Sequence, residues 1–467
     1  MSLRRSLIFL GSIVSVGLAL RIAVMLLSRS YEIPNQMDHW DFGYETGRIA
    51  RSLATGQGFS SPLPEPSGPT ALLPAGYPLV LAGVFRVFGV YTTQSAVAAY
   101  LLNCLFSALT CIVLYRLGER LFGRVTGLVA AALLALYPPS IWHAVNTIWD
   151  TTLLGMALVV LIAWLYGLPE CPGTAQLIGT GLLMGLVAFI NPAPVSLYPA
   201  VALVLWRRLR NQGTSGYREI AILTGSCFLV CVPWMTRNAI QVGSFTPRSG
   251  AGLNLRIGNN DAVWRQGTGA EDLSIYPSNS EEEGRLFYKL GEIGYDRYCA
   301  HLVMDYIRNH PDRFAALTLI RIRAWWFGQQ SEWTGNLKLA FHVSALKSLS
   351  WLLPLPFFVI GCFAAWRNRI DVGWLAIVLL VYPVPYYFIF VAERYHFPVE
   401  PFLLLVGGYG LVQIWLWLLR VRSAWLVSNE SRSGGWPSRG RCSRPPSRWR
   451  RAAPAGSWRP PDEWACR

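Results

Sequence analysis

Long apolar runs alternate with shorter polar stretches along most of the chain. A helix needs roughly 20 apolar residues to cross a hydrocarbon core of about 30 Å. Shorter runs that end at proline can cross as broken helices where surrounding protein satisfies the freed backbone groups. The pattern therefore predicts an all-α polytopic membrane protein with roughly ten transmembrane helices. The expected spans are 7–27, 95–115, 125–136, 152–166, 176–190, 195–206, 220–234, 348–366, 372–391 and 398–419.

The first long polar stretch, residues 28–93, is predicted to be an outer loop and is called the first outer loop below. It is rich in Gly and Pro, yet residues 44–53 have helical spacing and residues 77–88 form a short amphipathic run. Neither run is long enough to span a bilayer. Both are therefore predicted as helices lying along the membrane surface.

The second long polar stretch, residues 237–347, is predicted to be a small, mainly helical domain and is called the second outer loop. Ser280 precedes the acidic run at its centre and Glu283 stands three residues later, which is the spacing of a capping box. This pattern predicts a helix over 281–309, ended by the His310-Pro311 pair. An amphipathic helix over 312–327 is expected to follow.

The charge balance also indicates a membrane protein. Of the 467 residues, 53% are hydrophobic and 14% are charged, whereas soluble chains carry roughly 25% charged residues. The net charge is +15. Arginine clusters stand in short loops beside apolar runs, as in cytoplasmic loops, instead of gathering on one domain as in nucleic-acid-binding proteins. A cytoplasmic N-terminus and ten crossings then place both polar loops on the outer side.

The C-terminal stretch differs from the rest of the chain. Residues 421–467 are rich in Arg, Pro, Ser and Gly, a composition typical of disordered segments. We therefore predict a transmembrane module over residues 1–420 and a basic, disordered cytoplasmic tail over 421–467.

Three carboxylates stand close together at the start of the first outer loop. They are Asp38, Asp41 and Glu45. If Asp41 opens a helix, the i, i+4 spacing places it and Glu45 on one face. Such carboxylates can act as a general base or bind a divalent metal ion. The structural alternative is a set of acids stabilised at a helix N-terminus.

Other ionisable residues stand at the predicted outer ends of spans. Asp150 precedes the span 152–166 and His143 lies just before it, where an N-terminal helix acid and a packed histidine are the structural alternatives. The string ERYHFPVEP carries Arg394 and Tyr395 before the last span. Arginine binds phosphate oxygens bidentately, although an interfacial anchor would have the same composition. Similar border positions are occupied by Arg21, Arg237 and Arg256.

The order of these motifs resembles that of the GT-C glycosyltransferases, in particular the bacterial protein-mannosyltransferase and aminoarabinose-transferase group, glycosyltransferase family 39. The similarity extends over about residues 1–420. It includes LGERLFGR at 117–124, LYPPSIWHAVNTIWDT before Asp150, PWMTRN and ERYHFPVEPF. The chain departs from the family at its acidic motif, because the usual Asp-Glu pair is absent. Further matching residues are Tyr44, Ala50, Arg51, Leu53, Gly56, Gly58, Phe59, Pro74, Gly76, Tyr77 and Pro78.

The resemblance implies a GT-C-like fold and an inverting glycosyltransferase that takes a sugar from a polyprenyl-phosphate carrier. The acceptor would be a lipid, a glycan or a protein at the outer face of a bacterial inner membrane, in contact with membrane lipids and without nucleic acid. Asp38, Asp41 or Glu45 would be the carboxylate that acts as the base or positions the acceptor. Asp150 and His143 would form a second acidic, acceptor or metal site.

In the same resemblance, Arg394 and Tyr395 would lie near the carrier phosphate, with Arg237, Arg256 and Arg21 as further candidates. No cofactor is certain, and a divalent metal ion is an open expectation. Two other functions remain open at this point: a secondary transporter and a non-catalytic membrane subunit that binds lipid. A transporter would place a polar seam through the bilayer.

Overall fold

The computed structural model describes residues 2–32, 42–328 and 352–433. The regular secondary structure of these described ranges consists of α-helices and 3-10 helices. One isolated β-bridge within them joins Ser60 and Pro69. The elements are α1 Leu3–Ser28, α2 Glu45–Ala54, α3 Gly76–Phe88, α4 Thr93–Phe122, α5 Arg124–Leu136, α6 Pro138–Val145, α7 Thr151–Gly167, α8 Thr174–Ile190, η2 Ala193–Leu197, α9 Tyr198–Asn211, α10 Tyr217–Val242, α11 Ala251–Gly258, α12 Asp261–Gln266, η3 Leu273–Ile275, α13 Glu281–Asn309, α14 Pro311–Phe327, α17 Pro354–Arg367, α18 Gly373–Val381, α19 Val384–Phe388, α20 Glu393–His396, η4 Phe397–Val399 and α21 Glu400–Ser433.

The chain divides into two compact units, Met1–Leu416 and Trp417–Arg467. Everything described below belongs to the first unit. The structure describes the second unit only as the end of α21, and most of the predicted tail 421–467 lies outside the described residues. The boundary at residue 420 therefore stays a prediction.

Helix α4 forms the centre of the apolar bundle. It packs against α1, α5 and α7, and its Tyr100, Cys104, Leu114 and Tyr115 are fully buried. A buried hydrophobic surface of this kind extends over α5, α7, α8, α18 and the start of α21 as one contiguous core. Much of the opposite surface of these helices remains apolar and exposed, as expected where lipid takes the place of water.

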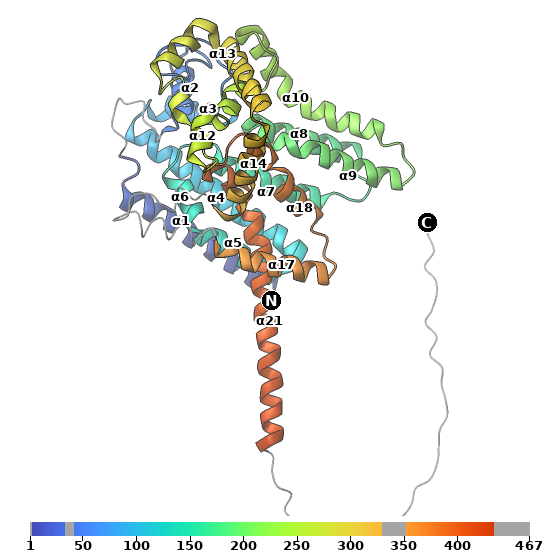
Figure 1. Cartoon of the computed structure of the whole chain (residues 1–467). Coiled ribbons are helices and arrows are strands. Elements are labelled where there is room, and N and C mark those ends of the chain that lie inside the picture. Colours follow the sequence, from blue (N-terminus) through green and yellow to red (C-terminus); the bar gives the residue numbers. More distant parts are fainter. Residues whose placement is uncertain (1, 33–41, 329–351, 434–467) are drawn as a thin grey trace, which may run out of the picture. The chain divides into compact units, whose positions relative to one another are not determined.

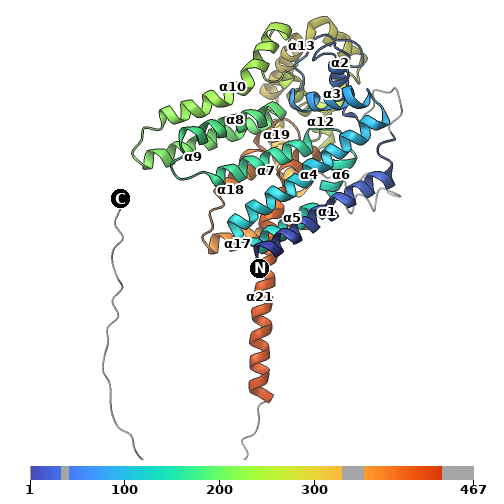
Figure 2. The ribbon, with the colours of Figure 1, turned by 180° about the vertical axis from the view of Figure 1, so that it is seen from behind.

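Helices α8, α9 and α10 lie side by side in both ribbon views (Figures 1 and 2). The close contact of α8 with α10 depends on a small residue, since a Cβ added at Gly185 would lie 2.6 Å from the carbonyl oxygen of Cys227. Small residues at such contacts are a common means of packing helices in membranes.

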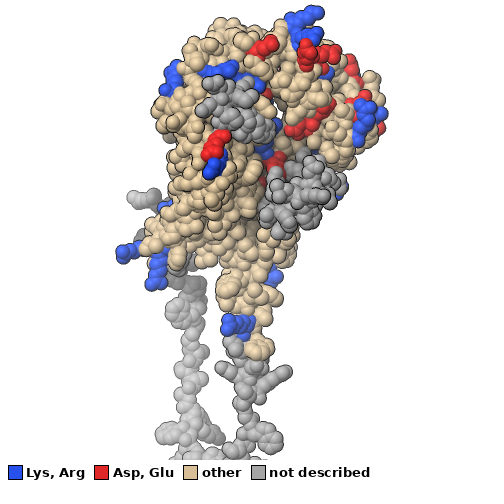
Figure 3. Space-filling model, turned by 90° about the vertical axis from the view of Figure 1, so that its left-hand side faces the viewer, with Lys and Arg blue, Asp and Glu red and all other residues tan. Residues whose placement is uncertain are grey.

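The elements of the two outer loops gather at one end of the bundle, where α2, α3, α12 and α13 are neighbours (Figures 1 and 2). Charged side chains of both signs cluster at this end, whereas the bundle surface beside it is mostly uncharged (Figure 3). The second outer loop has its own small core around Leu253, Phe287, Tyr295 and Cys299. The prediction of an all-α protein with several apolar helices is confirmed, whereas the interfacial position of α2 and α3 and the outer side of the loop domain stay predictions.

The count of ten transmembrane helices is not confirmed. Among the described residues, four helices are long and apolar enough to cross a membrane, or five if the bent pair α5 and α6 counts as one span. Five more apolar segments have 10–17 residues: α3, α7, α8, α17 and the pair α18–α19. The helical segment predicted over 281–309 is present but kinked, since Gly291 has non-helical backbone angles of φ 69° and ψ 166°. The Oγ of Ser280 accepts a hydrogen bond from the backbone N–H of Glu283 at 3.3 Å.

Two predicted spans have other boundaries in the structure. Helix α10 continues through Pro233 to Val242, so the span predicted to end at 234 is longer than expected. The span predicted over 372–391 is shorter in the structure, where α18 and α19 together form one apolar segment, Gly373–Phe388, that is interrupted at Tyr382 and Pro383. Proline removes a backbone hydrogen-bond donor, which accounts for this interruption.

Candidate functional site

A cavity of about 250 Å³ lies where the outer loops meet the ends of the apolar helices. Its walls come from both outer loops, the N-terminus of α7, the C-terminus of α8 and the broken segment after Pro383. Polar and aromatic side chains dominate the lining where these elements converge. Concave sites with a few convergent polar groups are the usual form of ligand sites.

Glu45 enters the cavity as the first residue of α2. The two residues before it, Gly43 and Tyr44, both have left-handed φ values, of 74° and 44°. Gly43 is required at its position, since a Cβ there would lie 2.6 Å from the carbonyl oxygen of Ile148. A left-handed Tyr is uncommon and costs energy, and such strain is concentrated at functional sites.

Tyr276, from the second outer loop, lines the same cavity as Glu45. Burial raises the pKa of Tyr276 well above its usual value, and the charge and hydrogen bonding of Glu45 raise it further. The phenol therefore stays protonated and is available as a hydrogen-bond donor to the carboxylate. The chain has 20 tyrosines, and neither charge nor periodicity in the sequence set Tyr276 apart from the others.

Asp150 occupies the N-cap position of α7 but makes no side-chain capping bond. Its carboxylate instead accepts a hydrogen bond from Asn191 Nδ2 at 2.8 Å and lines the cavity. Burial raises the pKa of Asp150, while the Asn191 hydrogen bond and the positive charges of Arg248 and Arg394 act in the opposite direction. The structural alternative of a helix-capping acid does not account for these contacts.

Arg394 and Tyr395 are brought to the cavity by the short helix α20. The Arg394 guanidinium lies 4.7 Å from the ring centroid of Trp149 and donates from Nη2 to the Tyr395 hydroxyl at 3.1 Å. Tyr395 in turn stacks on Tyr386, with ring centroids 4.6 Å apart. The guanidinium thus lies over the aromatic rings of Trp149 and Tyr395 at the cavity wall, an arrangement that arginine readily adopts.

Arg248 is a second cation of the cavity lining, which the sequence did not single out. It follows α10 in the string SFTPRSG and belongs to no cluster of arginines. Its Nε donates to the carbonyl oxygen of Leu72 at 2.9 Å, which ties the second outer loop to the first. Tyr382 and Asn191 also line the cavity and were not predicted.

Three of the predicted phosphate-binding arginines lie elsewhere. Arg21 is 2% exposed and donates to the carbonyls of Gly17 and Ala135 and to the Ser140 hydroxyl, at 2.9, 2.8 and 2.7 Å. Arg237 donates to the carbonyl oxygens of Phe59 and Thr70. Both guanidinium groups therefore bind the protein itself and do not line the cavity.

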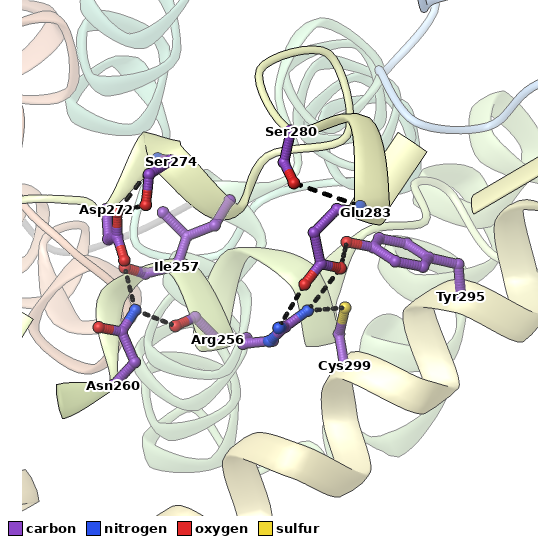
Figure 4. Close-up of polar contacts among 9 residues, drawn as sticks. All are labelled: Arg256, Ile257, Asn260, Asp272, Ser274, Ser280, Glu283, Tyr295 and Cys299. Carbon is purple, nitrogen blue, oxygen red and sulfur yellow. Dashed lines mark hydrogen bonds and ion pairs between the residues drawn. The ribbon is translucent and has the colours of Figure 1, made fainter. Parts of the chain in front are cut away.

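Arg256 belongs to a buried network in the second outer loop (Figure 4). Its guanidinium pairs with Glu283 at 2.6 and 2.9 Å and contacts the Cys299 sulfur at 3.6 Å, while the Tyr295 hydroxyl donates to Glu283 at 2.6 Å. Burial alone would raise the pKa of Glu283, but the hydrogen bonds from Arg256 and Tyr295 hold it below the usual range. The network stabilises the packing of α11 on α13.

His143 is 5% exposed and its ring lies 4.7 Å from that of Phe397, outside the cavity lining. Asp38 and Asp41 fall in the stretch 33–41, which lies outside the described residues. Among the residues that the structure describes, no group of three or more His, Cys, Asp or Glu could hold a metal ion. The cavity thus brings together Glu45, Asp150, Arg394 and Tyr395 from the predicted set.

Comparison with known proteins gives one family and a set of distant structures. Residues 73–236, about a third of the chain, match the family described as dolichyl-phosphate-mannose-protein mannosyltransferase. This stretch includes Asp150 and Asn191, whereas Glu45, Arg248 and Arg394 lie outside it. No curated protein matches the chain.

Two solved structures illustrate the structural similarity. One is the archaeal oligosaccharyltransferase AglB from Archaeoglobus fulgidus in complex with an inhibitory peptide and a dolichol-phosphate, at 12% identity and a TM-score of 0.42 over 91% of this chain and 52% of that one. The other is ArnT from Cupriavidus metallidurans bound to undecaprenyl phosphate, at 14% identity and a TM-score of 0.38 over 85% and 77%. The chain spans about half the length of the oligosaccharyltransferase.

Proposed function

We propose that this chain is a membrane glycosyltransferase of the GT-C superfamily, which transfers a sugar from a polyprenyl-phosphate donor to a hydroxyl-bearing lipid, glycan or protein acceptor. The description of the matching family, a transferase that uses dolichyl-phosphate mannose, supports a donor of this class. The reaction would take place at the outer, periplasmic face of a bacterial inner membrane, where both outer loops are predicted to lie.

The observation that carries this proposal is the composition of one cavity. Two carboxylates, Glu45 and Asp150, share it with two arginines, Arg248 and Arg394. Sugar transfer from a lipid phosphate needs a group that removes a proton from the acceptor and groups that hold a phosphate. The cavity contains both kinds of group, contributed by different structural elements.

In the proposed reaction, a carboxylate of the first outer loop accepts the proton of the acceptor hydroxyl. Among the residues that the structure describes, Glu45 is the candidate for this carboxylate. The acceptor oxygen forms a bond to the anomeric carbon from the face opposite the phosphate, and the bond between that carbon and the phosphate oxygen breaks. The anomeric configuration inverts, and polyprenyl phosphate leaves with the electron pair. Asp150, held by Asn191, orients the acceptor or the sugar.

The arginines have a role that follows from charge. The donor is a phosphodiester with one negative charge, and the leaving polyprenyl phosphate gains a second as the bond breaks. Guanidinium groups that already face the phosphate stabilise this developing charge without reorganisation. Arg394, whose guanidinium lies over the Trp149 ring, is the residue that we assign to the carrier phosphate.

The experiment that tests the proposal is direct. Purified protein is incubated with a short-chain polyprenyl-phosphate hexose, and release of polyprenyl phosphate is followed with and without cell-envelope acceptors. We expect release by the wild type and none by the Glu45→Gln variant. A wild type that binds the lipid but never cleaves it would favour the non-catalytic subunit, and transport of the lipid without cleavage would favour a transporter.

The same assay tests whether the reaction requires a divalent metal ion. A divalent ion held by Asp38, Asp41 and Glu45 stays a prediction. If it is correct, a chelator abolishes release and added Mg²⁺ or Mn²⁺ restores it, whereas activity unchanged by the chelator would contradict it.

A further inference from the structure

His396 and Glu400 form a buried polar pair just beyond the cavity. The His396 Nδ1 lies 3.0 Å from Glu400 Oε1, and the two side chains are only 4% and 3% exposed. Their neighbours belong to the apolar core of the bundle. Burying two ionisable groups carries a large desolvation cost, and an apolar pair of similar volume often serves stability equally well. The pair therefore calls for a role other than stability.

Contact with substrate is not that role. Neither side chain lines the large cavity that contains Arg394 and Tyr395. The pair borders instead a separate, much smaller cavity with Tyr137, Trp326 and Phe358. The segment from 394 to 400 thus separates the two cavities, with Arg394 and Tyr395 facing one and the pair facing the other.

The pair lies at the start of a long helix. Helix α20, the 3-10 turn η4 and α21 follow one another without a gap and form one helical segment that begins at Glu393. The first turn of a helix lacks the full set of intrahelical hydrogen bonds. The contact from His396 to Glu400 spans the 3-10 turn and ties this first turn, which carries Arg394 and Tyr395, to α21.

A continuous set of contacts leads from the pair back to the guanidinium. The His396 ring meets Trp325 edge-on at 5.0 Å, and Trp325 stacks on Tyr386 at 5.7 Å. Tyr386 stacks on Tyr395, whose hydroxyl accepts from Arg394. Fixing His396 therefore fixes both the helical turn that carries Arg394 and the aromatic ring that orients it.

We propose that His396 and Glu400 are positioning residues, which hold Arg394 and Tyr395 in the geometry that binds the carrier phosphate. The inference rests on the proposed function for the role of Arg394. It goes beyond that function because it assigns the alignment of the phosphate site to a polar pair that never touches substrate.

The test uses the full-length protein in lipid nanodiscs and measures the dissociation constant of undecaprenyl phosphate together with the thermal unfolding temperature. The main variant is the double substitution His396→Phe with Glu400→Leu, which removes the polar pair but keeps an aromatic ring against Trp325. We expect an unfolding temperature close to that of the wild type and binding about tenfold weaker, the loss of roughly one charge-assisted hydrogen bond.

Two companion variants make the result specific. Glu400→Gln keeps an acceptor oxygen for His396 and should bind within about twofold of the wild type, since the contact and not the charge does the positioning. Tyr409, on the same helix α21, accepts a hydrogen bond from Asn368 at the end of α17 and does not line the cavity. Tyr409→Phe removes this hydrogen bond and should leave binding unchanged. In an Arg394→Ala background, the double substitution should add no further loss.

The possible outcomes separate this inference from the proposed function. A stable double variant that binds as tightly as the wild type overturns the positioning role and leaves the proposed function intact. Losses that simply add to that of Arg394→Ala also overturn it. If the wild type itself fails to bind undecaprenyl phosphate, the proposed function fails and this inference fails with it. Should the double variant not fold, His396→Phe alone is measured with the same expectations.

Discussion

Arg21 and Arg394 stand at similar places in the sequence, each beside an apolar run, yet the structure gives them opposite surroundings. The guanidinium of Arg21 is enclosed by the backbone carbonyls of Gly17, Leu134 and Ala135 and by Ser140. The guanidinium of Arg394 lies over Trp149 at the wall of a cavity, and within the described part of the chain it donates a hydrogen bond to Tyr395. The guanidinium of Arg21 thus binds groups of the protein itself, whereas that of Arg394 lines a cavity in which a ligand could bind.

The same division separates other pairs of residues. Arg237 satisfies carbonyls of the first outer loop and Arg256 pairs with Glu283, whereas Arg248 uses its Nε on Leu72 and faces the cavity. The type of residue at a membrane border therefore does not show whether it holds the fold or binds a ligand. Its hydrogen-bond partners do.

The largest effect is expected at the carboxylates of the cavity. Glu45→Gln should lower kcat by about a thousandfold, within the range for loss of a general base. Release of polyprenyl phosphate is the measurement, with unfolding temperature as the check on folding. If Asp150→Asn causes the larger loss and Glu45→Gln only a small one, the two roles are exchanged.

Arg248→Ala should lower kcat/KM by roughly thirtyfold, because one of two groups that stabilise the developing phosphate charge is removed. Arg248→Lys keeps the charge but not the fork of donors, and should recover only part of the activity. Steady-state kinetics with varied donor gives both values. Equal activity of Arg248→Ala and wild type would place Arg248 with the arginines that serve only the fold.

Asn191→Ala tests the control of Asp150. The hydrogen bond from Asn191 lowers a pKa that burial raises, so its loss should raise the pKa of Asp150 further. Because a group with a raised pKa stays protonated to higher pH, the acid limb of the pH–rate profile should move upward by about half a pH unit to one unit. A profile that does not move would show that ionisation of Asp150 is not required.

The smallest effect is expected in the second outer loop, away from the cavity. Since the folded-state pKa of Glu283 is lowered, the pairing with Arg256 contributes stability above the unfolded carboxyl pKa of about 4.3 and loses it as the pH falls through the lower folded value. Thermal unfolding at pH 7 and below about pH 4 should show a loss of roughly 1 kcal/mol. The Glu283→Gln variant should be less stable at pH 7 and lack this acid dependence.

Much of the fold could be predicted because its physics is local. Hydrophobic runs gave the apolar helices, and the Ser280 cap gave the start of α13 at the right residue. The break at Pro383 was missed because an apolar run of twenty residues hides it, and breaks of this kind depend on what surrounds the freed backbone. The predicted span 220–234 was too short because proline usually ends a helix, whereas Pro233 lies inside the intact helix α10.

The candidate site was predictable only where charge stood out from an apolar background. Glu45, Asp150 and Arg394 are ionisable residues at the ends of apolar runs, so their sequence context marked them. Tyr276 and Arg248 reach the cavity from the second outer loop, and only tertiary contacts bring that loop over α2. Arg21 had the same sequence signal as Arg394, but the carbonyls of α5 that enclose it are more than a hundred residues away.

The most direct test measures kcat/KM for release of polyprenyl phosphate by Arg394→Ala and Arg21→Ala, each per mole of folded protein. We predict a loss of about a hundredfold for Arg394→Ala at an unchanged unfolding temperature. For Arg21→Ala we predict a lower unfolding temperature and wild-type kcat/KM in the molecules that remain folded. Equal losses of kcat/KM in both variants, or a fully active Arg394→Ala, would contradict the assignment of the cavity as the phosphate site.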